Sequence, residues 1–100
     1  MKIKTSVDGT KAIIEIEGKL TVNTSPDLTA AVEQLPDDVC DIDVDFTKVD
    51  YIASAGLRVL VATDKLAVKR GGRMRILHPC SEVRDVLEMT GLSEVFTIER

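Results

Sequence analysis

The chain has one histidine and two cysteines, and these residues stand in no catalytic pattern. The one histidine, His78, lies beside Pro79 at the end of a predicted strand. No motif pairs it with Ser54 or Cys80, so the spacing does not indicate a nucleophile activated by a neighbouring base. We therefore predict that His78 is a loop or surface residue and that the protein is not an enzyme.

Three aspartates, Asp41, Asp43 and Asp45, alternate with apolar residues in a strand-like run. Carboxylates on one strand face can bind a hard cation such as Mg²⁺ or Ca²⁺. Along an extended strand, however, neighbouring members of such a set are about 7 Å apart, which is wide for one ion without ligands from elsewhere. The pattern therefore predicts a solvated or partner-facing surface and no metal site.

The glycines and cysteines also form no cofactor motif. Gly56 and the pair Gly71-Gly72 fit neither a GxxxxGK[ST] nor a GxGxxG pattern, so nucleotide binding and hydrolysis are not indicated. Cys40 and Cys80 are single and widely spaced, which predicts reduced, partly buried thiols. We expect no cofactor.

One hydroxyl has an unusual setting. Ser54 stands where a strand and loop give way to a helix, and the small residues Ala55 and Gly56 follow it. A serine at this place can be a helix N-cap that accepts a hydrogen bond from an orphan N–H group. Small neighbours would also leave the hydroxyl open to another macromolecule, as a modification site requires. The residues alone leave both interpretations open.

Composition narrows the choice of partner. The chain has 100 residues, of which 44% are hydrophobic, 30% charged and 3% aromatic, with a net charge of −4. These values are typical of one folded domain with an aliphatic core. Negative charge and scarce aromatic side chains disfavour nucleic acid and anionic lipid as ligands. We therefore expect a protein partner.

The sequence shows no membrane-targeting pattern. No apolar signal segment opens the chain, and its longest apolar run, residues 59–62, is far below the roughly 18 residues that a membrane span needs. We expect a cytoplasmic protein without membrane insertion.

The first third of the chain predicts a hairpin and a helix. Residues 2–7 and 12–17 are strand-like and flank an Asp8-Gly9 turn, which predicts an antiparallel hairpin. A hydroxyl cap and an early proline at residues 24–27 predict a helix start, and the proline after Leu35 ends that helix.

The middle predicts a strand, a loop and a second helix. Residues 41–46 alternate, so we expect the apolar members on a buried face and the three aspartates on a wet face. A loop over residues 47–51 is followed by a helix over 57–70, which Gly71-Gly72 ends. The side expected to be buried carries Leu57, Leu60, Val61 and Val68, and the opposite side carries Arg58, Lys65 and Lys69.

The last third alternates strand and helix again. We expect a strand over residues 73–77, a helix capped by Ser81 that ends at Gly91, and a final strand near 95–98. Alternation of this kind requires crossover connections, which give parallel neighbouring strands covered by helices.

The run from Tyr51 to Leu57, Tyr-Ile-Ala-Ser-Ala-Gly-Leu, resembles the signature of the STAS domain, a module shared by sulfate transporters and bacterial anti-sigma factor antagonists. Its usual form is an aromatic or apolar pair followed by Asp-Ser-(Ser/Thr/Ala)-Gly-Leu. Three further segments are similar to family motifs in the same order: Gly18-Lys19-Leu20 with Thr24-Ser25-Pro26, then Gly71-Gly72, then Met89-Thr90-Gly91-Leu92. The resemblance covers residues 1–100 as one STAS domain.

The resemblance implies an α/β fold with a mixed, mostly parallel sheet and helices packed largely on one side. It also implies an anti-sigma factor antagonist, which in its unmodified form binds an anti-sigma factor that is also a serine kinase and so releases a sigma factor. Phosphorylation at Ser54 would eject the antagonist, and a separate serine phosphatase would reset it. The implied partner-binding residues are Thr21, Asn23, Thr24, Ala53, Ser54, Ala55, Gly56 and Arg58.

Two positions depart from the family pattern. The usual acid before the serine is Ala53 here, and the acid of the Gly-Glu-Leu-Asp segment is Thr21. In the family these acids help to shape the contact with the partner kinase. Their replacement keeps a second function open, a STAS scaffold or accessory subunit of a stress-signalling assembly or a lipid-transport complex, without a phosphorylation cycle.

Overall fold

The computed structural model describes residues 1–100 and contains five strands, three α-helices and one short 3₁₀ helix. In chain order they are β1 (Lys2–Asp8), β2 (Lys11–Leu20), α1 (Ser25–Glu33), β3 (Asp41–Ile52), α2 (Ser54–Lys69), β4 (Arg73–Leu77), α3 (Ser81–Met89), η1 (Leu92–Glu94) and β5 (Thr97–Glu99). None of the helices has the length and apolar character needed to cross a membrane.

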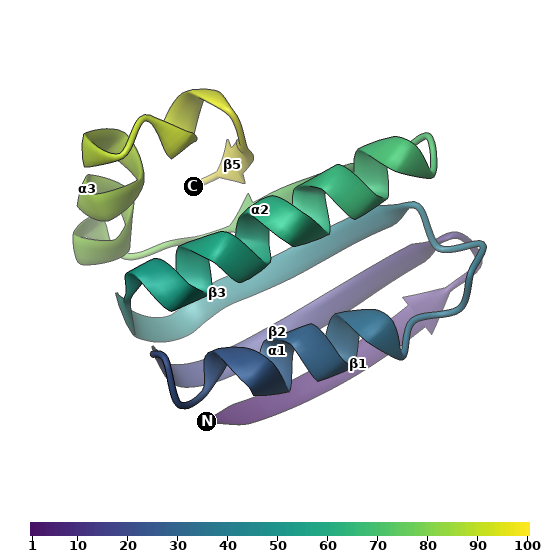
Figure 1. Ribbon diagram of the computed structural model, residues 1–100, viewed down its shortest axis with the longest axis horizontal. Helices are drawn as coiled ribbons and strands as arrows, with labels where there is room; N and C mark the ends of the chain where they lie inside the picture. The colour runs from purple at the N-terminus through teal and green to yellow at the C-terminus, as the bar shows by residue number, and fades with distance from the viewer.

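The strands form one sheet in the order β1-β2-β3-β4-β5. The pair β1 and β2 is antiparallel and the other three pairs are parallel. Each parallel step moves to the next position in the same direction, and right-handed crossovers then put every connecting helix on the same face. Figure 1 shows α1 and α2 in front of the sheet and α3 beside them. This architecture confirms the predicted fold class.

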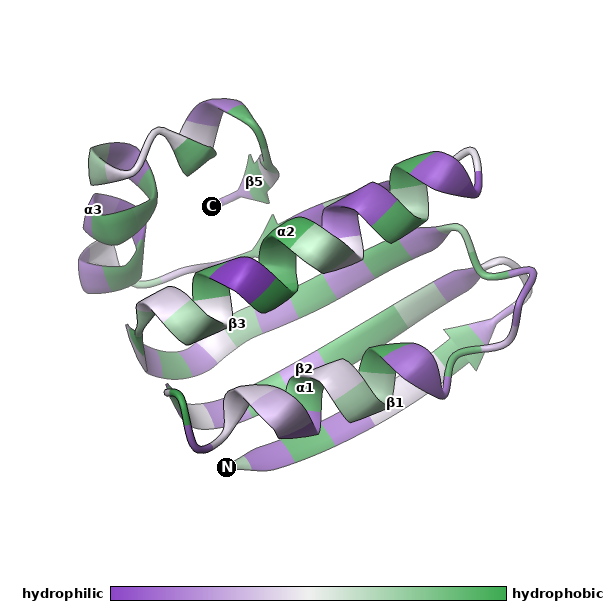
Figure 2. Ribbon diagram, in the orientation of Figure 1, coloured by the Kyte–Doolittle hydropathy of each residue, from purple (hydrophilic) through white to green (hydrophobic).

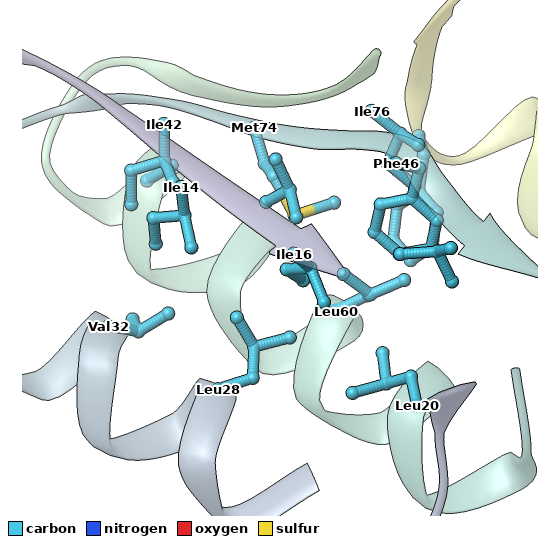
Figure 3. Packing of buried hydrophobic residues seen from close by; sticks show 14 of the residues in the cluster. Ile14, Ile16, Leu20, Leu28, Val32, Ile42, Phe46, Leu60, Met74 and Ile76 are labelled. Atoms are coloured by element: carbon cyan, nitrogen blue, oxygen red, sulfur yellow. The ribbon is translucent and has the colours of Figure 1, made fainter. Parts of the chain in front are cut away.

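The core lies between the sheet and this helix layer. Alternate strand residues such as Ile14, Ile42 and Ile76 point toward Leu28 of α1 and Leu60 of α2, and all five side chains are fully buried (Figure 3). Apolar and hydrophilic residues alternate along most of the strand residues (Figure 2). One face of the sheet is therefore covered, and the other face carries most of the charged strand residues.

The longest strand runs further than the sequence predicts. Residues 47–51, predicted as a loop, belong to β3, which continues to Ile52. The strict alternation fails here because Thr47 and Lys48 are both exposed. The pairing with β2 shifts register at two irregularities, one between Glu15 and Glu17 and one at Gly18, whose φ is +114°. These bulges keep the two strands paired to their ends.

The helix starts also differ from prediction. Helix α2 begins at Ser54 and not at Leu57, and α3 has Cys80 at its N-cap position, so that Ser81 is the first helical residue and not the cap. The last strand is Thr97–Glu99, two residues later than its predicted start. The ends of α2 and α3 near Gly71 and Gly91, both at positive φ, agree with the prediction.

The buried side of α2 was predicted in part. Leu60 is fully buried, and Leu57 and Val61 are half-buried as expected. Val68 was predicted to be buried but has 60% of its surface exposed. The buried stripe consists of Gly56, Leu60, Thr63 and Ala67. Small residues at both ends of this stripe let the helix approach the sheet closely.

Candidate functional site

The candidate site lies at the carboxyl ends of two neighbouring parallel strands, β2 and β3. Leu20 and Ile52 are register partners at the ends of these strands, and the N–H of Ala53 donates to the carbonyl of Leu20 at 2.9 Å. The loop over residues 21–24 and the start of α2 therefore lie next to each other, at the left-hand end of the sheet in Figure 1. The fold brings together two segments that are about thirty residues apart in the sequence.

Hydroxyl groups hold the loop over residues 21–24 in place. The Oγ1 of Thr24 accepts a hydrogen bond from the N–H of Thr21 at 2.8 Å and donates to the carbonyl of Lys19 at 2.7 Å. Thr24 was expected to cap α1, but its hydroxyl bonds no N–H of that helix. Val22 and Asn23 form the exposed tip of the loop.

Ser54 is the first helical residue of α2, and the N-cap position belongs to Ala53. Ala53 keeps an extended backbone, with ψ at 171°, because its N–H is still bonded to β2. The Ser54 side chain is exposed, and its hydroxyl makes no hydrogen bond within the chain. The N-cap interpretation of Ser54 is therefore wrong. No hydrogen bond within the chain uses its hydroxyl.

Two backbone donors lie free beside this hydroxyl. In the first turn of α2, the N–H groups of Gly56 and Leu57 bond the carbonyl of Ala53, whereas those of Ser54 and Ala55 bond no acceptor. Arg58 is exposed one turn further along the same helix and belongs to no ion pair. The start of α2 is therefore rich in unpaired donors and contains no acidic residue.

Gly56 has a different place from the one the sequence suggested. It is buried, and a Cβ added there would lie 2.7 Å from Cγ of Leu20 and 3.1 Å from Cγ1 of Ile52. Glycine is needed because α2 crosses the end of β2 at close range. Gly56 therefore supports the site from beneath and does not form part of the partner-facing surface.

Shallow grooves lie on both sides of Ser54. Between α1 and α2, Val22 and Pro26 face Ala55 and Val59. Between α2 and η1, a second groove is lined by Ser54, Leu57, Arg58, Val61, Thr90 and Leu92. The sequence reasoning missed Val22, which is 69% exposed. An isolated apolar residue in a polar loop between a strand and a helix was the available signal.

The two positions that depart from the family pattern are neighbours in space. Thr21 and Ala53 directly follow the register partners Leu20 and Ile52, and neither carries a charge. Among the partner-binding residues that the resemblance implies, Arg58 has the only formal charge, and one acid, Glu33, lines the groove between α1 and α2. The surface around Ser54 is thus nearly neutral, so one added phosphate would dominate its electrostatics.

The three strand aspartates lie on the face of the sheet that the helices do not cover, and they are less exposed to solvent than predicted. The side chain of Asp43 is only 3% exposed, because Lys11 Nζ lies 3.0 Å and Arg75 Nη2 2.7 Å from its Oδ2. Arg75 also bonds Oε1 of Glu99 at 2.9 Å. Asp43 is therefore the centre of an ion-pair network across four strands and not a solvated carboxylate.

This network bears on metal binding. Lys11 and Arg75 already neutralise the carboxylate that a cation would need, and Asp41 and Asp45 do not converge on it. We expect calorimetry with Mg²⁺ or Ca²⁺ to detect no site with a dissociation constant below roughly 100 μM. A tighter site that disappears in Asp43→Asn would contradict this prediction.

The network also predicts a pH dependence of stability. Burial alone raises the pKa of Asp43, but hydrogen bonds and positive charge from Arg75 and Lys11 outweigh it and lower that pKa. A lowered pKa in the folded state adds stability above the unfolded-state pKa of about 3.9, and this stability is lost as the pH falls through the folded pKa. We expect Asp43→Asn to lose less stability than the wild type on acidification below about pH 4.

Urea titrations across this acidic range measure the effect. Asp38→Asn removes an exposed carboxylate without an ion pair and serves as the matched control. Equal acid sensitivity of Asp43→Asn and wild type would show that the network contributes nothing in this pH range.

Comparisons with known proteins show which family and which relatives this chain is similar to. Residues 3–98 match the family model described as "Mlab, STAS domain". The anti-sigma-B factor antagonist of Bacillus subtilis strain 168 is 27% identical over 85 residues, which cover 85% of this chain and 78% of that relative.

Two solved structures share the fold. An anti-sigma factor antagonist from Mycobacterium paratuberculosis has a TM-score of 0.85 at 21% identity, over 98% of this chain and 84% of that one. The phosphorylated form of the Bacillus cell fate determinant SpoIIAA has a TM-score of 0.76 at 18% identity, over 99% and 92% of the two chains.

Proposed function

The chain belongs to the STAS domain family, and from that membership we propose that residues 1–100 form one STAS domain that acts as an anti-sigma factor antagonist. In its unmodified form the protein binds an anti-sigma factor with serine kinase activity and so releases a sigma factor in the cytoplasm. The kinase phosphorylates Ser54 and thereby ejects the antagonist, and a serine phosphatase restores it. The relative from Bacillus subtilis, which is named an anti-sigma-B factor antagonist, supports the antagonist part of this proposal.

The observation that carries the proposal is the state of Ser54. Its hydroxyl is exposed, unbonded and next to the small residue Ala55, so a kinase active site can reach it. A serine with a capping bond would first have to give that bond up. In this role the protein is a substrate and a binding partner, and ATP and the catalytic groups belong to the kinase.

The start of α2 can accommodate a phosphate without unfolding. The phosphoryl group adds about −1.5 to −2 charges at pH 7, and the positive end of a helix dipole favours a negative charge. The free N–H groups of Ser54 and Ala55 are within the same turn, and Arg58 is the (i, i+4) neighbour that can pair with it.

Release then follows from the surface and not from the fold. Before modification, the partner meets a nearly neutral face formed by Thr21, Asn23, Thr24, Ala55 and the Ser54 hydroxyl. After modification, the same contact has to desolvate a group with close to two negative charges. That desolvation and any acidic group of the partner oppose binding.

The test combines binding with phosphate transfer. The purified protein is mixed with each anti-sigma kinase encoded in the same genome, with and without ATP, and the modified residue is mapped by mass spectrometry. We expect one kinase to bind without ATP hydrolysis, to transfer phosphate to Ser54 and then to lose its affinity. Binding without transfer, or transfer to another hydroxyl, would contradict the proposed cycle.

A second function has specific support. Thr21 and Ala53 leave the site without the two acids usual in kinase-regulated members, and the matching family model names Mlab beside the STAS domain. An accessory subunit of a lipid-transport complex, or a scaffold of a stress-signalling assembly, would use the same neutral surface for permanent docking. It would copurify with its partner and keep that contact when ATP is added.

A further inference from the structure

The outer edge of β1 is the longest open edge of the sheet. β1 ends the strand order on one side, and six of its seven residues are exposed. No other element lies beyond it in Figure 1, where it forms the lower margin. The opposite edge strand, β5, has only three residues. An open strand of this length presents a row of unpaired N–H and C=O groups that can pair with another strand.

The hairpin fixes which backbone groups point outward. The turn between β1 and β2 contains two residues, so Asp8 and Lys11 close it as a hydrogen-bonded pair. Hydrogen-bonded and non-hydrogen-bonded pairs alternate along an antiparallel ladder. The even residues of β1 therefore bond β2, and the N–H and C=O groups of Ile3, Thr5 and Val7 point away from the sheet.

These outward groups suit a second copy of the same strand. In an antiparallel pair centred on Thr5, that residue meets its own copy, and Ile3 of one chain meets Val7 of the other. All outward-pointing groups then find partners, because odd residues pair only with odd residues. On the helix side of the sheet, this register brings the half-buried Ile3 against Val7, which is 45% exposed.

Charge complementarity favours the same register. Lys2 of each chain, whose Nζ lies 3.9 Å from Oε2 of Glu17 in the same chain, stands opposite Asp8 of the other chain, so a further ion pair can form at each end of the joined strands. Lys4 stands opposite Ser6, and its diagonal neighbours in the second chain are Asp8 on one side and Lys4 on the other. Edge lysines usually prevent strand pairing. In this register, however, the residue directly opposite Lys2 is an acid and the residue directly opposite Lys4 is neutral.

We propose that the protein forms a twofold dimer through antiparallel pairing of β1 with β1 of a second copy, centred on Thr5, which joins the two sheets into one. The candidate surface lies at the carboxyl ends of β2 and β3, and none of its residues belongs to β1. The dimer therefore presents two Ser54 hydroxyls, and its formation does not depend on the proposed function.

Disulfide trapping tests the register. In a background with Cys40→Ser and Cys80→Ser, Thr5→Cys places two cysteines with Cα atoms about 5.5 Å apart, which a disulfide can bridge. Val7→Cys is the matched control on the same strand face, since its two copies would be about 14 Å apart. Under mild oxidation we expect Thr5→Cys to form linked dimer at least about tenfold faster than Val7→Cys.

Charge exchange gives a second, reversible test. Lys2→Glu puts two acids opposite each other and Asp8→Lys puts two lysines, so each variant alone should sediment as a monomer where the wild type is a dimer. A mixture of the two variants restores both ion pairs and should dimerise. Lys65→Glu makes the same charge change on the exposed side of α2 and should leave the dimer intact.

The outcomes decide the proposal. A wild-type protein that stays monomeric at millimolar concentration would overturn it. Equal crosslinking of Thr5→Cys and Val7→Cys would overturn the register, and so would a mixture of the charge variants that remains monomeric although each variant has the wild-type circular dichroism. None of these results bears on whether Ser54 is phosphorylated.

Discussion

Leu60→Ala is expected to lower the free energy of unfolding by about 2–5 kcal/mol, the range found when a buried leucine is truncated. Leu60 is fully buried on α2 and shares its cluster with Ile16, Leu20 and Leu28 (Figure 3). The residues beneath it belong to the sheet, which cannot move inward to fill the space. Much of the volume would therefore remain as a cavity.

Urea or guanidinium titration measures this loss directly. Val68→Ala is the matched control, because Val68 is on the same helix but is 60% exposed, and its change should stay within about 0.5 kcal/mol. A loss below roughly 0.5 kcal/mol for Leu60→Ala itself would mean that α2 does not bury this side chain in solution.

The architecture could be predicted from the sequence because its causes are local. The alternation in residues 41–46 predicts a strand, and the Asp8-Gly9 turn predicts a hairpin. Gly71-Gly72 predicts the end of a helix. The alternating order of strands and helices then predicts parallel neighbouring strands covered by helices, whereas the resemblance to the STAS family predicted that the helices lie largely on one face.

Features set by contacts between distant segments could not be predicted. The second half of β3 does not alternate, and it remains a strand only because bulges at Glu15/Glu17 and Gly18 let β2 follow it. The same pairing extends the backbone of Ala53 through its bond to Leu20 and so moves the helix start to Ser54. A serine at this boundary resembles an N-cap in sequence, and only the register shows that it is one residue inside the helix.

The candidate site also has features that could be predicted from local sequence and features that depend on contacts between distant segments. The motif around Ser54 and the loop over residues 21–24 were visible in the sequence, and their adjacency follows from the parallel pairing of β2 with β3. The burial of Gly56 against Leu20 and the ion pairs of Asp43 depend on side chains from other elements. Sequence spacing carries no information about such contacts.

The second large effect is expected at Ser54. Ser54→Asp should fold as the wild type does, because an acid in the first turn is favoured by the helix dipole and the free N–H groups of Ser54 and Ala55. It should weaken binding to the cognate anti-sigma factor by at least about a hundredfold, since the contact must now desolvate a charge.

Ser81→Asp is the matched control for this substitution. Ser81 is also exposed and is the first helical residue of its helix, α3, after a residue that provides no side-chain cap. The change therefore adds the same charge at the first residue of a helix outside the candidate surface, in a first turn that already contains Glu82. Binding should be unchanged, and a loss as large as that of Ser54→Asp would assign the effect to net charge and not to the site.

Ser54→Ala should behave in the opposite way. The Ser54 hydroxyl makes no hydrogen bond within the chain, so its removal should change stability by less than about 0.5 kcal/mol, whereas loss of a true cap would cost about 0.5–2 kcal/mol. The variant should bind the kinase about as tightly as the wild type and stay bound when ATP is added. Partner binding by titration, with and without ATP, checks both variants. If the wild type also stays bound with ATP while Ser54→Ala is equally stable and equally tight, Ser54 does not act as a switch and the accessory-subunit function replaces the antagonist cycle.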